Sequence, residues 1–244
     1  MKIQGFIFNW KGHETRARAH EEKIKKCIEV TVINSDEQLS DKYSEWVHLD
    51  DTAYFTAQWN KAVELFDADI FFHIQADAEF DQFDQLIAKA KSVYERHKFG
   101  VYEPNVDFTE LEYDKSKLLH IDSNLVEVPV TDCTCWFING NVIRMLPHVN
   151  ASVNYYGWGI PNAIASLCWM YGLPCVRDYD FLIKHPRGRG YASSEALRQM
   201  LAYFQCLSPE MRKEIALSQA QMRYLIWPHV LREYREACGI KAPA

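Results

Sequence analysis

Short apolar runs alternate with longer amphipathic stretches through the first hundred residues, and this alternation restricts the fold more than any other feature of the chain. The apolar runs are typical of buried β-strands and occupy residues 3–8, 29–33, 46–49 and 70–74. The stretches between them carry apolar residues at helical spacing and occupy residues 13–27, 52–66 and 80–94. Strands that alternate with helices favour right-handed crossovers and a sheet covered on both faces. We therefore expect an α/β fold, a Rossmann-like three-layer sandwich with a mixed, mainly parallel sheet.

The pattern changes after Gly100. Three short apolar segments separated by polar turns predict added strands of mixed direction: residues 118–121, 125–130 and 133–138. Residues 160–171 are almost wholly apolar and predict a buried helix that ends at Gly172. Residues 175–178 predict a last strand.

The part of the chain that follows Ser193 has a helical pattern. Ser208 before Pro209 is a typical helix start, as Thr52 is for the helix over residues 52–66. We expect a main domain over residues 1–191 and a C-terminal helical extension over residues 192–244.

Composition excludes some classes of function and location. The chain has 27 basic and 33 acidic residues, and its net charge of −6 disfavours non-specific binding to nucleic acid or to an anionic membrane. No window reaches the apolar length of a membrane helix, and the first residues lack the apolar core of a signal peptide. The seven cysteines are scattered and resemble reduced core residues. We expect a cytoplasmic protein.

Polar residues follow each of the first four predicted strands. They are Asn9, the stretch 34–36, the pair 50–51 and the stretch 75–77. Ligands of parallel sheets bind beyond the carboxyl ends of the strands, so these residues are expected to form one nucleotide-sized crevice.

Asp77 lies three residues after the apolar run of residues 70–74, in the polar stretch that ends the predicted strand. A carboxylate at a strand end can hold Mg²⁺ or Mn²⁺, which take oxygen ligands and bridge phosphates. A helix N-cap or turn residue before the helix over residues 80–94 explains the same carboxylate equally well.

Two further segments can carry chemistry. Residues 184–191, KHPRGRGY, combine cations and glycines beside a histidine, which suits a diphosphate leaving group. Residues 154–162, NYYGWGIPN, place aromatic rings between glycines, which suits stacking on a sugar or base. The alternatives are an exposed basic loop and a tight turn with core aromatics.

Five segments together resemble the nucleotide-sugar glycosyltransferases of the GT-A fold, and among them the large inverting family 2 of bacterial and phage enzymes. The resemblance covers roughly residues 3–191 and is carried by VINSD (32–36), QWNKA (58–62), QAD (75–77), YGWG (156–159) and KHPRGRGY (184–191).

The resemblance implies a role for particular residues. Asp77 matches the last carboxylate of the family's D-x-D metal motif, and His185 matches a histidine that completes the shell of Mn²⁺ or Mg²⁺. Trp158 matches the aromatic residue of an acceptor-side turn. The residues that would bind the base and ribose of the donor are Asn34, Ser35, Asp36, Asp51 and Asn60. Asn9 and Gln75, at the same predicted edge, are further candidates for binding the substrate.

Two departures from the family pattern change the expected chemistry. Gln75 stands where D-x-D has its first acid, so we expect Lys184, Arg187 and Arg189 to neutralise part of the diphosphate charge. Residues 160–162 contain no carboxylate to act as general base after the G-W-G turn.

If the chain is an inverting enzyme, another carboxylate must take the proton of the acceptor, because a general base has to lie within hydrogen-bond reach of it. Asp132 is our candidate, and Asp178 and Asp180 are its rivals. Solvation of a turn or strand end explains each of the three as well.

The leading hypothesis is a metal-assisted glycosyltransferase, a hexosyl- or pentosyltransferase that moves a sugar from a UDP or GDP sugar to an acceptor hydroxyl. The acceptor would be a glycan, a small molecule or a hydroxymethylated base in phage DNA. One alternative is a non-catalytic nucleotide-sugar or glycan-binding protein on the same fold. Another is a nucleotidyltransferase, for which residues 9–12 are a poor glycine-rich loop.

Overall fold

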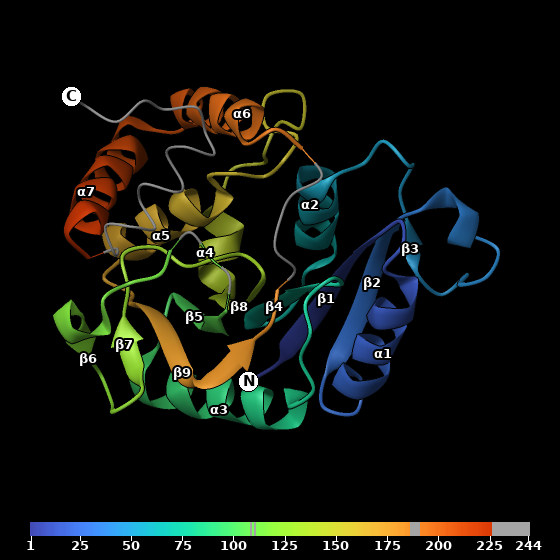
Figure 1. Cartoon of the computed structure of the whole chain (residues 1–244), viewed down its shortest axis with the longest axis horizontal. Helices are drawn as coiled ribbons and strands as arrows, with labels where there is room; N and C mark the ends of the chain where they lie inside the picture. The colour runs from blue at the N-terminus through green and yellow to red at the C-terminus, as the bar shows by residue number, and fades with distance from the viewer. Residues whose placement is uncertain (108, 110, 186–190, 226–244) are drawn as a thin grey trace.

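A nine-stranded sheet with helices on both faces forms the protein (Figure 1). The computed structural model describes residues 1–107, 109, 111–185 and 191–225. The strands are β1 (Ile3–Trp10), β2 (Glu29–Ser35), β3 (Val47–His48), β4 (Ile70–Gln75), β5 (Val101–Val106), β6 (Leu119–His120), β7 (Leu125–Glu127), β8 (Cys135–Asn139) and β9 (Cys175–Ile183). The helices are α1 (Glu14–Ile24), α2 (Phe55–Leu65), α3 (Phe83–His97), α4 (Gly140–Met145), α5 (Ile160–Met170), α6 (Ser193–Gln205) and α7 (Pro209–Leu225).

The sheet has a parallel part and a mixed part, in the strand order β3-β2-β1-β4-β8-β5-β9-β7-β6. The four strands β3, β2, β1 and β4 are parallel to one another. β8 runs antiparallel to both of its neighbours, β9 is parallel to β5, and β7 and β6 complete the sheet in antiparallel pairs. The expected α/β class and the mixed directions after Gly100 are confirmed, with the parallel pairs concentrated in the first half of the chain.

The two faces of the sheet have separate hydrophobic cores. α1 and α3 cover one face, and α2, α4 and α5 cover the other (Figure 1). Apolar residues of α6 and α7, among them Phe204 and Met211, belong to the same core as α2 and α5. The C-terminal helices therefore pack directly on the sheet domain, and Ser208 accepts a hydrogen bond at 3.2 Å from the Met211 amide at the start of α7, as expected of a cap.

Strand β5 was absent from the sequence-based prediction. It contains Glu103 and Pro104, which are unusual in a central strand. Glu103 is tolerated because its side chain pairs inside the protein with Arg177 of β9. A register shift at Pro104 and Asn105 accommodates the missing amide of the proline.

Two predicted boundaries are wrong. α2 begins at Phe55 with Tyr54 at its N-cap position, because the amide of Thr52 is used in a separate turn closed by Asp50 at 2.8 Å. β9 continues to Ile183 rather than ending at residue 178, since its pairing with β5 resumes at Leu182 and Ile183 after a register shift. No helix among the described residues has both the length and the apolar composition that a membrane span requires.

Candidate active site

The polar strand ends meet at one edge of the sheet, as predicted. Asn9 of β1 lies beside Asn34 of β2, and Gln75 of β4 pairs with the residue that precedes Asn9. On the other side, Asn34 pairs with His48 of β3. The carboxyl ends of four neighbouring strands therefore bring these amide and imidazole side chains to one edge of the sheet.

Asn9 and Asn34 are buried and bonded to each other. Asn9 Nδ2 donates to Asn34 Oδ1 at 2.7 Å, and Asn34 Nδ2 donates to the carbonyl of Asp36 at 2.8 Å. Gln58 of α2, which sequence reasoning passed over, donates from Nε2 to the carbonyl of Asn9 at 2.6 Å. It begins the QWNKA segment, but nothing in the sequence indicated a role for it beyond that of a polar residue on the otherwise apolar face of a predicted helix. These bonds hold the β1 and β2 ends rigidly in place.

The segment after β2 forms a tight turn. Ser35 Oγ donates to the carbonyl of Asn9 at 3.4 Å, and Asp36 Oδ1 accepts the amide of Gln38 at 3.2 Å. Asp51 comes from the loop before α2 and accepts the amide of Glu37 at 2.5 Å. The structure thus brings Ser35, Asp36 and Asp51 to the same edge as Asn9 and Asn34.

Asp77 and His185 face each other although 107 residues separate them in the chain. His185 Nε2 lies 3.6 Å from Asp77 Oδ2, and the two side chains are 20% and 14% exposed. α3 begins at Phe83 with Gln82 at its N-cap, so Asp77 does not cap that helix. Within the described part of the chain, the buried Oδ1 of Asp77 has no hydrogen-bond partner.

The surroundings of Asp77 perturb its titration. Burial raises the pKa of the Asp77 carboxyl above its ordinary value, and the nearby imidazoles of His185 and His13 oppose the shift. His13 stands just before α1, and burial lowers its pKa while Asp77 raises it. Sequence reasoning missed His13, because a single histidine beside a glycine at a helix start carries no distinctive pattern.

The Asp77–His185 pair has the donor atoms of a divalent-cation site. One oxygen of the Asp77 carboxylate is buried without a hydrogen-bond partner among the described residues, and the His185 imidazole lies beside it. Carboxylate oxygen and imidazole nitrogen are both ligand types that Mn²⁺ accepts. Within residues 1–107, 109, 111–185 and 191–225, no three His, Cys, Asp or Glu side chains are grouped to hold a metal. Asp77 and His185 are therefore two candidate ligands among the described residues.

Lys184 and Gln75 are close to this pair along the chain, Lys184 directly before His185 and Gln75 two residues before Asp77. The backbone of Lys184 forms two hydrogen bonds with that of Glu79, at 2.7 and 3.1 Å, which brings the end of β9 to the turn after β4. Gln75 Nε2 donates to the carbonyl of Cys133 at 3.4 Å. Arg187 and Arg189 lie outside the described residues.

Asp132 lies at the same edge, but its carboxylate is engaged. Its Oδ2 accepts a hydrogen bond from Thr109 at 2.7 Å, and its Oδ1 accepts two from Thr134, at 2.8 and 2.6 Å. Asp178 is buried and accepts the Tyr102 hydroxyl at 2.7 Å. Asp180 is bonded to Lys89 and Asn124.

Comparison with solved structures shows that this arrangement of strands is known. Over 97% of its length the chain resembles a mannosyltransferase from Pyrobaculum calidifontis in complex with GDP-Man and Mn²⁺, with a TM-score of 0.58, 15% identity and 73% of that chain covered. The chain has the GT-A glycosyltransferase fold.

Two further GT-A structures agree. GalNAc-T7 with UDP, GalNAc and Mn²⁺ matches 99% of this chain and 55% of its own, with a TM-score of 0.61 and 13% identity. TarS of S. aureus (residues 1–349) matches 92% of this chain and 72% of its own, with a TM-score of 0.57 and 10% identity. This chain thus spans little more than half of the GalNAc-T7 chain. Its sequence matches no protein-family model and no curated protein.

The G-W-G turn of this GT-A chain is closely packed. Gly157 and Gly159 have φ angles of 79° and 87°, and a Cβ on Gly157 would lie 2.2 Å from the ring of Phe55. Between them Trp158 donates from Nε1 to the hydroxyl of Tyr191 at 2.9 Å. The two glycines therefore fix the place of the aromatic ring that the sequence singled out.

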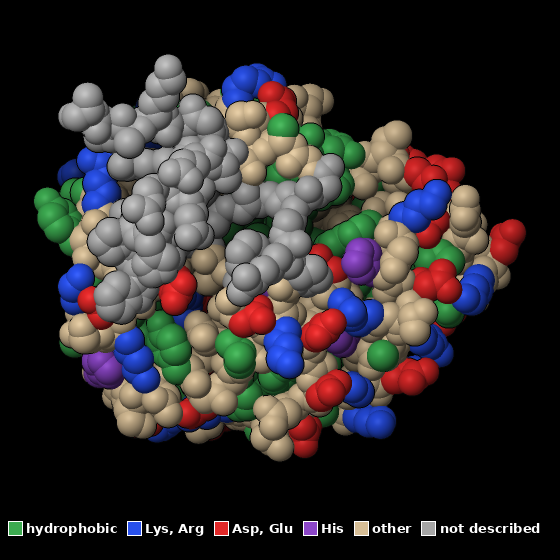
Figure 2. Space-filling model, in the orientation of Figure 1, with side chains coloured by type: hydrophobic (Ala, Val, Ile, Leu, Met, Phe, Trp, Pro, Cys, Tyr) green, Lys and Arg blue, Asp and Glu red, His purple; other side chains and the backbone are tan. Residues whose placement is uncertain are grey.

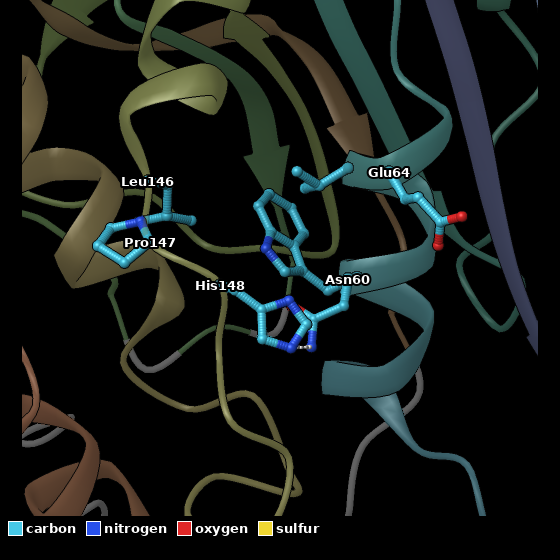
Figure 3. Close-up of a pocket in the computed structure, with 7 residues that line it drawn as sticks. Asn60, Glu64, Leu146, Pro147 and His148 are labelled. Carbon is cyan, nitrogen blue, oxygen red and sulfur yellow. Dashed lines mark hydrogen bonds between the residues drawn. The ribbon is translucent and has the colours of Figure 1, made fainter.

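Asn60 does not join the other predicted donor residues. Its Nδ2 donates to the carbonyl of Val149 at 2.7 Å and lies 3.4 Å from His148 Nε2. Figure 3 shows Asn60 and His148 side by side in a pocket of about 240 Å³. Asn60 follows Gln58 by two helical positions, so it points away from the strand ends that Gln58 contacts.

Proposed function

We propose that the chain is a glycosyltransferase that moves a sugar from a nucleoside diphosphate sugar to an acceptor hydroxyl. The observation that carries this proposal is the convergence of Asp77 and His185 at the strand-end edge of a GT-A fold. GDP-Man is bound to one of the similar structures and UDP-GlcNAc to another, which supports a UDP or GDP sugar as donor.

Asp77 and His185 would hold a divalent cation, Mn²⁺ or Mg²⁺. Bound there, the cation supplies positive charge to the departing diphosphate. Oxygens of the diphosphate and water would complete its coordination, because hard cations take six or more ligands. Lys184, which precedes His185, adds a second positive charge next to the leaving group.

The amide edge would bind the nucleoside of the donor. The buried amides of Asn9 and Asn34 fix this edge from inside the protein, and Asp36 with Asp51 line the turn beside them. Held side chains lose little conformational entropy on binding, so this edge is suited to fix the orientation of the donor.

Asp132 is our candidate for the general base. Its place next to β4 follows from the hydrogen bond of 2.9 Å between the Gln75 amide and the Thr134 carbonyl. To accept the proton of an acceptor hydroxyl, Asp132 exchanges its bond with Thr109 for one with the acceptor.

The test is sugar transfer and donor hydrolysis with UDP and GDP sugars, measured with Mn²⁺ and with EDTA. We expect Asp77→Ala and His185→Ala each to lower turnover by about a hundredfold or more, because each removes one ligand of the charge that stabilises the leaving group. His97→Ala is the matched control, since His97 is exposed at the end of α3. Full turnover in both site variants would exclude this site.

A non-catalytic sugar-nucleotide-binding protein is the second candidate. Gln75 in place of an acid and the engaged carboxylate of Asp132 favour it. It predicts binding of a UDP or GDP sugar by calorimetry without transfer to any glycan, small-molecule or hydroxymethylated-DNA acceptor. For the DNA acceptor, lysine and arginine side chains are interspersed with carboxylates on the face shown in Figure 2 rather than gathered into a stripe.

A further inference from the structure

The turn that carries Asp77 is held from helix α1 by two side chains. Arg16 donates from Nη1 to the carbonyl oxygen of Asp77 and from Nη2 to Glu79 Oε1 at 3.0 Å. One helical turn further, His20 Nε2 lies 2.8 Å from the carbonyl oxygen of Ala78. Three consecutive residues of the turn are thus contacted by one helix.

The chemical state of His20 follows from its burial. The side chain is 3% exposed, and burial lowers its pKa to about 4, so the imidazole is neutral at pH 7. A neutral ring has one N–H, and a nitrogen 2.8 Å from a carbonyl oxygen has to be the donor. Nε2 therefore carries the hydrogen, and Phe83 fixes the ring in an edge-on contact with centroids 5.2 Å apart.

The segment that carries His185 is fixed to the same turn. Glu79 and Lys184 exchange two backbone hydrogen bonds, so the residue before His185 lies beside the turn of Asp77. The amide of His185 also donates to Asp107 Oδ1 at 2.8 Å. Any shift of the 77–79 turn is therefore transmitted to the geometry between Asp77 and His185.

Open space lies next to the turn. A groove of about 550 Å³ is lined by Arg16, His20, Glu79 and Lys184, among others. Without the two α1 side chains, the backbone of the turn has room to move into this groove, because no tightly packed side chains would resist it there.

We propose that Arg16 and His20 are positioning residues, which hold the 77–79 turn so that the Asp77 carboxylate and the His185 imidazole bind the same cation. This inference rests on the proposed function of the pair. Groups that orient metal ligands typically change metal affinity by 10- to 100-fold when they are removed. The guanidinium suits this task because it serves two acceptors in a fixed plane, which an ammonium group does not.

The first test is Mn²⁺ affinity without donor or acceptor, measured by electron paramagnetic resonance of free Mn²⁺. We expect Arg16→Ala to weaken binding at least tenfold, Arg16→Lys to weaken it less, and His20→Gln to weaken it less than His20→Leu, since the glutamine amide can still donate to Ala78. Arg18→Ala is the matched control, because Arg18 lies on the same helix and pairs with Glu21 and Glu45 instead.

The second test does not depend on a metal. We expect the Glu79 amide, which donates to the Lys184 carbonyl, to exchange its hydrogen at least tenfold faster in Arg16→Ala than in the wild type or in Arg18→Ala. Wild-type exchange together with wild-type Mn²⁺ affinity in Arg16→Ala would overturn the positioning role and leave the proposed function intact. Unchanged Mn²⁺ binding in Asp77→Ala would instead overturn the metal site, and with it the role of the two α1 residues.

Discussion

Two acid–base pairs in this protein join distant parts of the chain, and their surroundings are opposite. Glu103 and Arg177 lie on the neighbouring strands β5 and β9 and are fully buried, whereas Asp77 and His185 lie at the strand-end edge and are partly exposed. Both oxygens of Glu103 are used, Oε1 by Arg177 and Oε2 by the amide of Asp132 at 2.7 Å.

The difference separates a structural pair from a candidate functional one. The protein supplies donors to both oxygens of Glu103, which oppose the burial that raises the pKa of its carboxyl, and the side chain anchors the loop of Asp132. The protein supplies none from the described residues to Oδ1 of Asp77, which is buried nonetheless. A buried polar atom without a partner calls for an explanation, and a bound cation is one that fits its chemistry.

The largest effect is expected at the buried pair. Glu103→Gln keeps the shape of the side chain but leaves the Arg177 charge without its counter-ion, so the free energy of unfolding should fall by about 3–5 kcal/mol. Urea denaturation measures it, with Glu95→Gln on the exposed face of α3 as the control within about 0.5 kcal/mol. A loss below about 1 kcal/mol would show that the charge of Glu103 is not needed by the fold.

The opposite result is expected at Asp77. Burial raises the pKa of its carboxyl, so ionised Asp77 is disfavoured by the fold, and Asp77→Asn should leave the metal-free protein as stable as the wild type or more so. Mn²⁺ at a hundred times its Kd should stabilise the wild type by about 2.7 kcal/mol and should leave the variant unchanged.

Thermal unfolding with and without Mn²⁺ measures both effects at Asp77. The exposed Asp41→Asn is the matched control and should respond to Mn²⁺ as the wild type does. Equal stabilisation of Asp77→Asn and the wild type by Mn²⁺ would place the cation elsewhere and remove the contrast between the two pairs.

His73 tests whether burial alone shifts the pKa of a side chain in this core. His73 lies on β4, and the centroid of its ring is 4.0 Å from that of the Phe8 ring. Burial lowers the pKa of its imidazole to about 3. The unfolded chain takes up a proton near pH 6.5 and the folded one does not, so stability is complete above that pH and falls as the pH drops toward 3.

The contribution of His73 should reach about 1.4 kcal/mol per pH unit within that window. Between pH 7 and pH 4, the free energy of unfolding should therefore fall less steeply with decreasing pH in His73→Leu than in the wild type. In the exposed His97→Leu this slope should be the same as in the wild type. Parallel slopes in His73→Leu and the wild type would mean that the buried ring is protonated in the folded state.

The sequence predicted the elements whose signal is local. Alternating apolar runs and helical spacing identified β1 to β4 and their helices, and the rule for parallel strand ends placed Asn9, Asn34 and Asp77 at one edge. The strand β5 was beyond that reasoning, because its Glu103 is explained only by Arg177, which lies far along the chain and next to it in the sheet.

The candidate site divides in the same way. Asp77 was found as the carboxylate after a predicted strand and His185 in the basic segment 184–191, and the family resemblance suggested that they share a metal. The structure places the two side chains 3.6 Å apart. His13, Arg16 and Gln58 were missed, because their roles depend on the three-dimensional path of α1 and α2 and not on a residue pattern. Asn60 was named as a donor-binding residue but lies against Val149 and His148 instead. The sequence did not reveal which side of α2 faces the strand ends.

The smallest effect is expected from giving the functional pair a second carboxylate. The Gln75 side chain donates two long hydrogen bonds to Cys133, to its carbonyl at 3.4 Å and to its Sγ at 3.8 Å, so its replacement loses little. Gln75→Asp should tighten Mn²⁺ binding by about three- to tenfold, because the affinity of such sites rises with the number of charged ligands. Gln75→Asn has the same length without the charge and should bind Mn²⁺ no more tightly than the wild type. Equal Mn²⁺ affinities of the two variants, measured by calorimetry, would mean that position 75 does not face the cation.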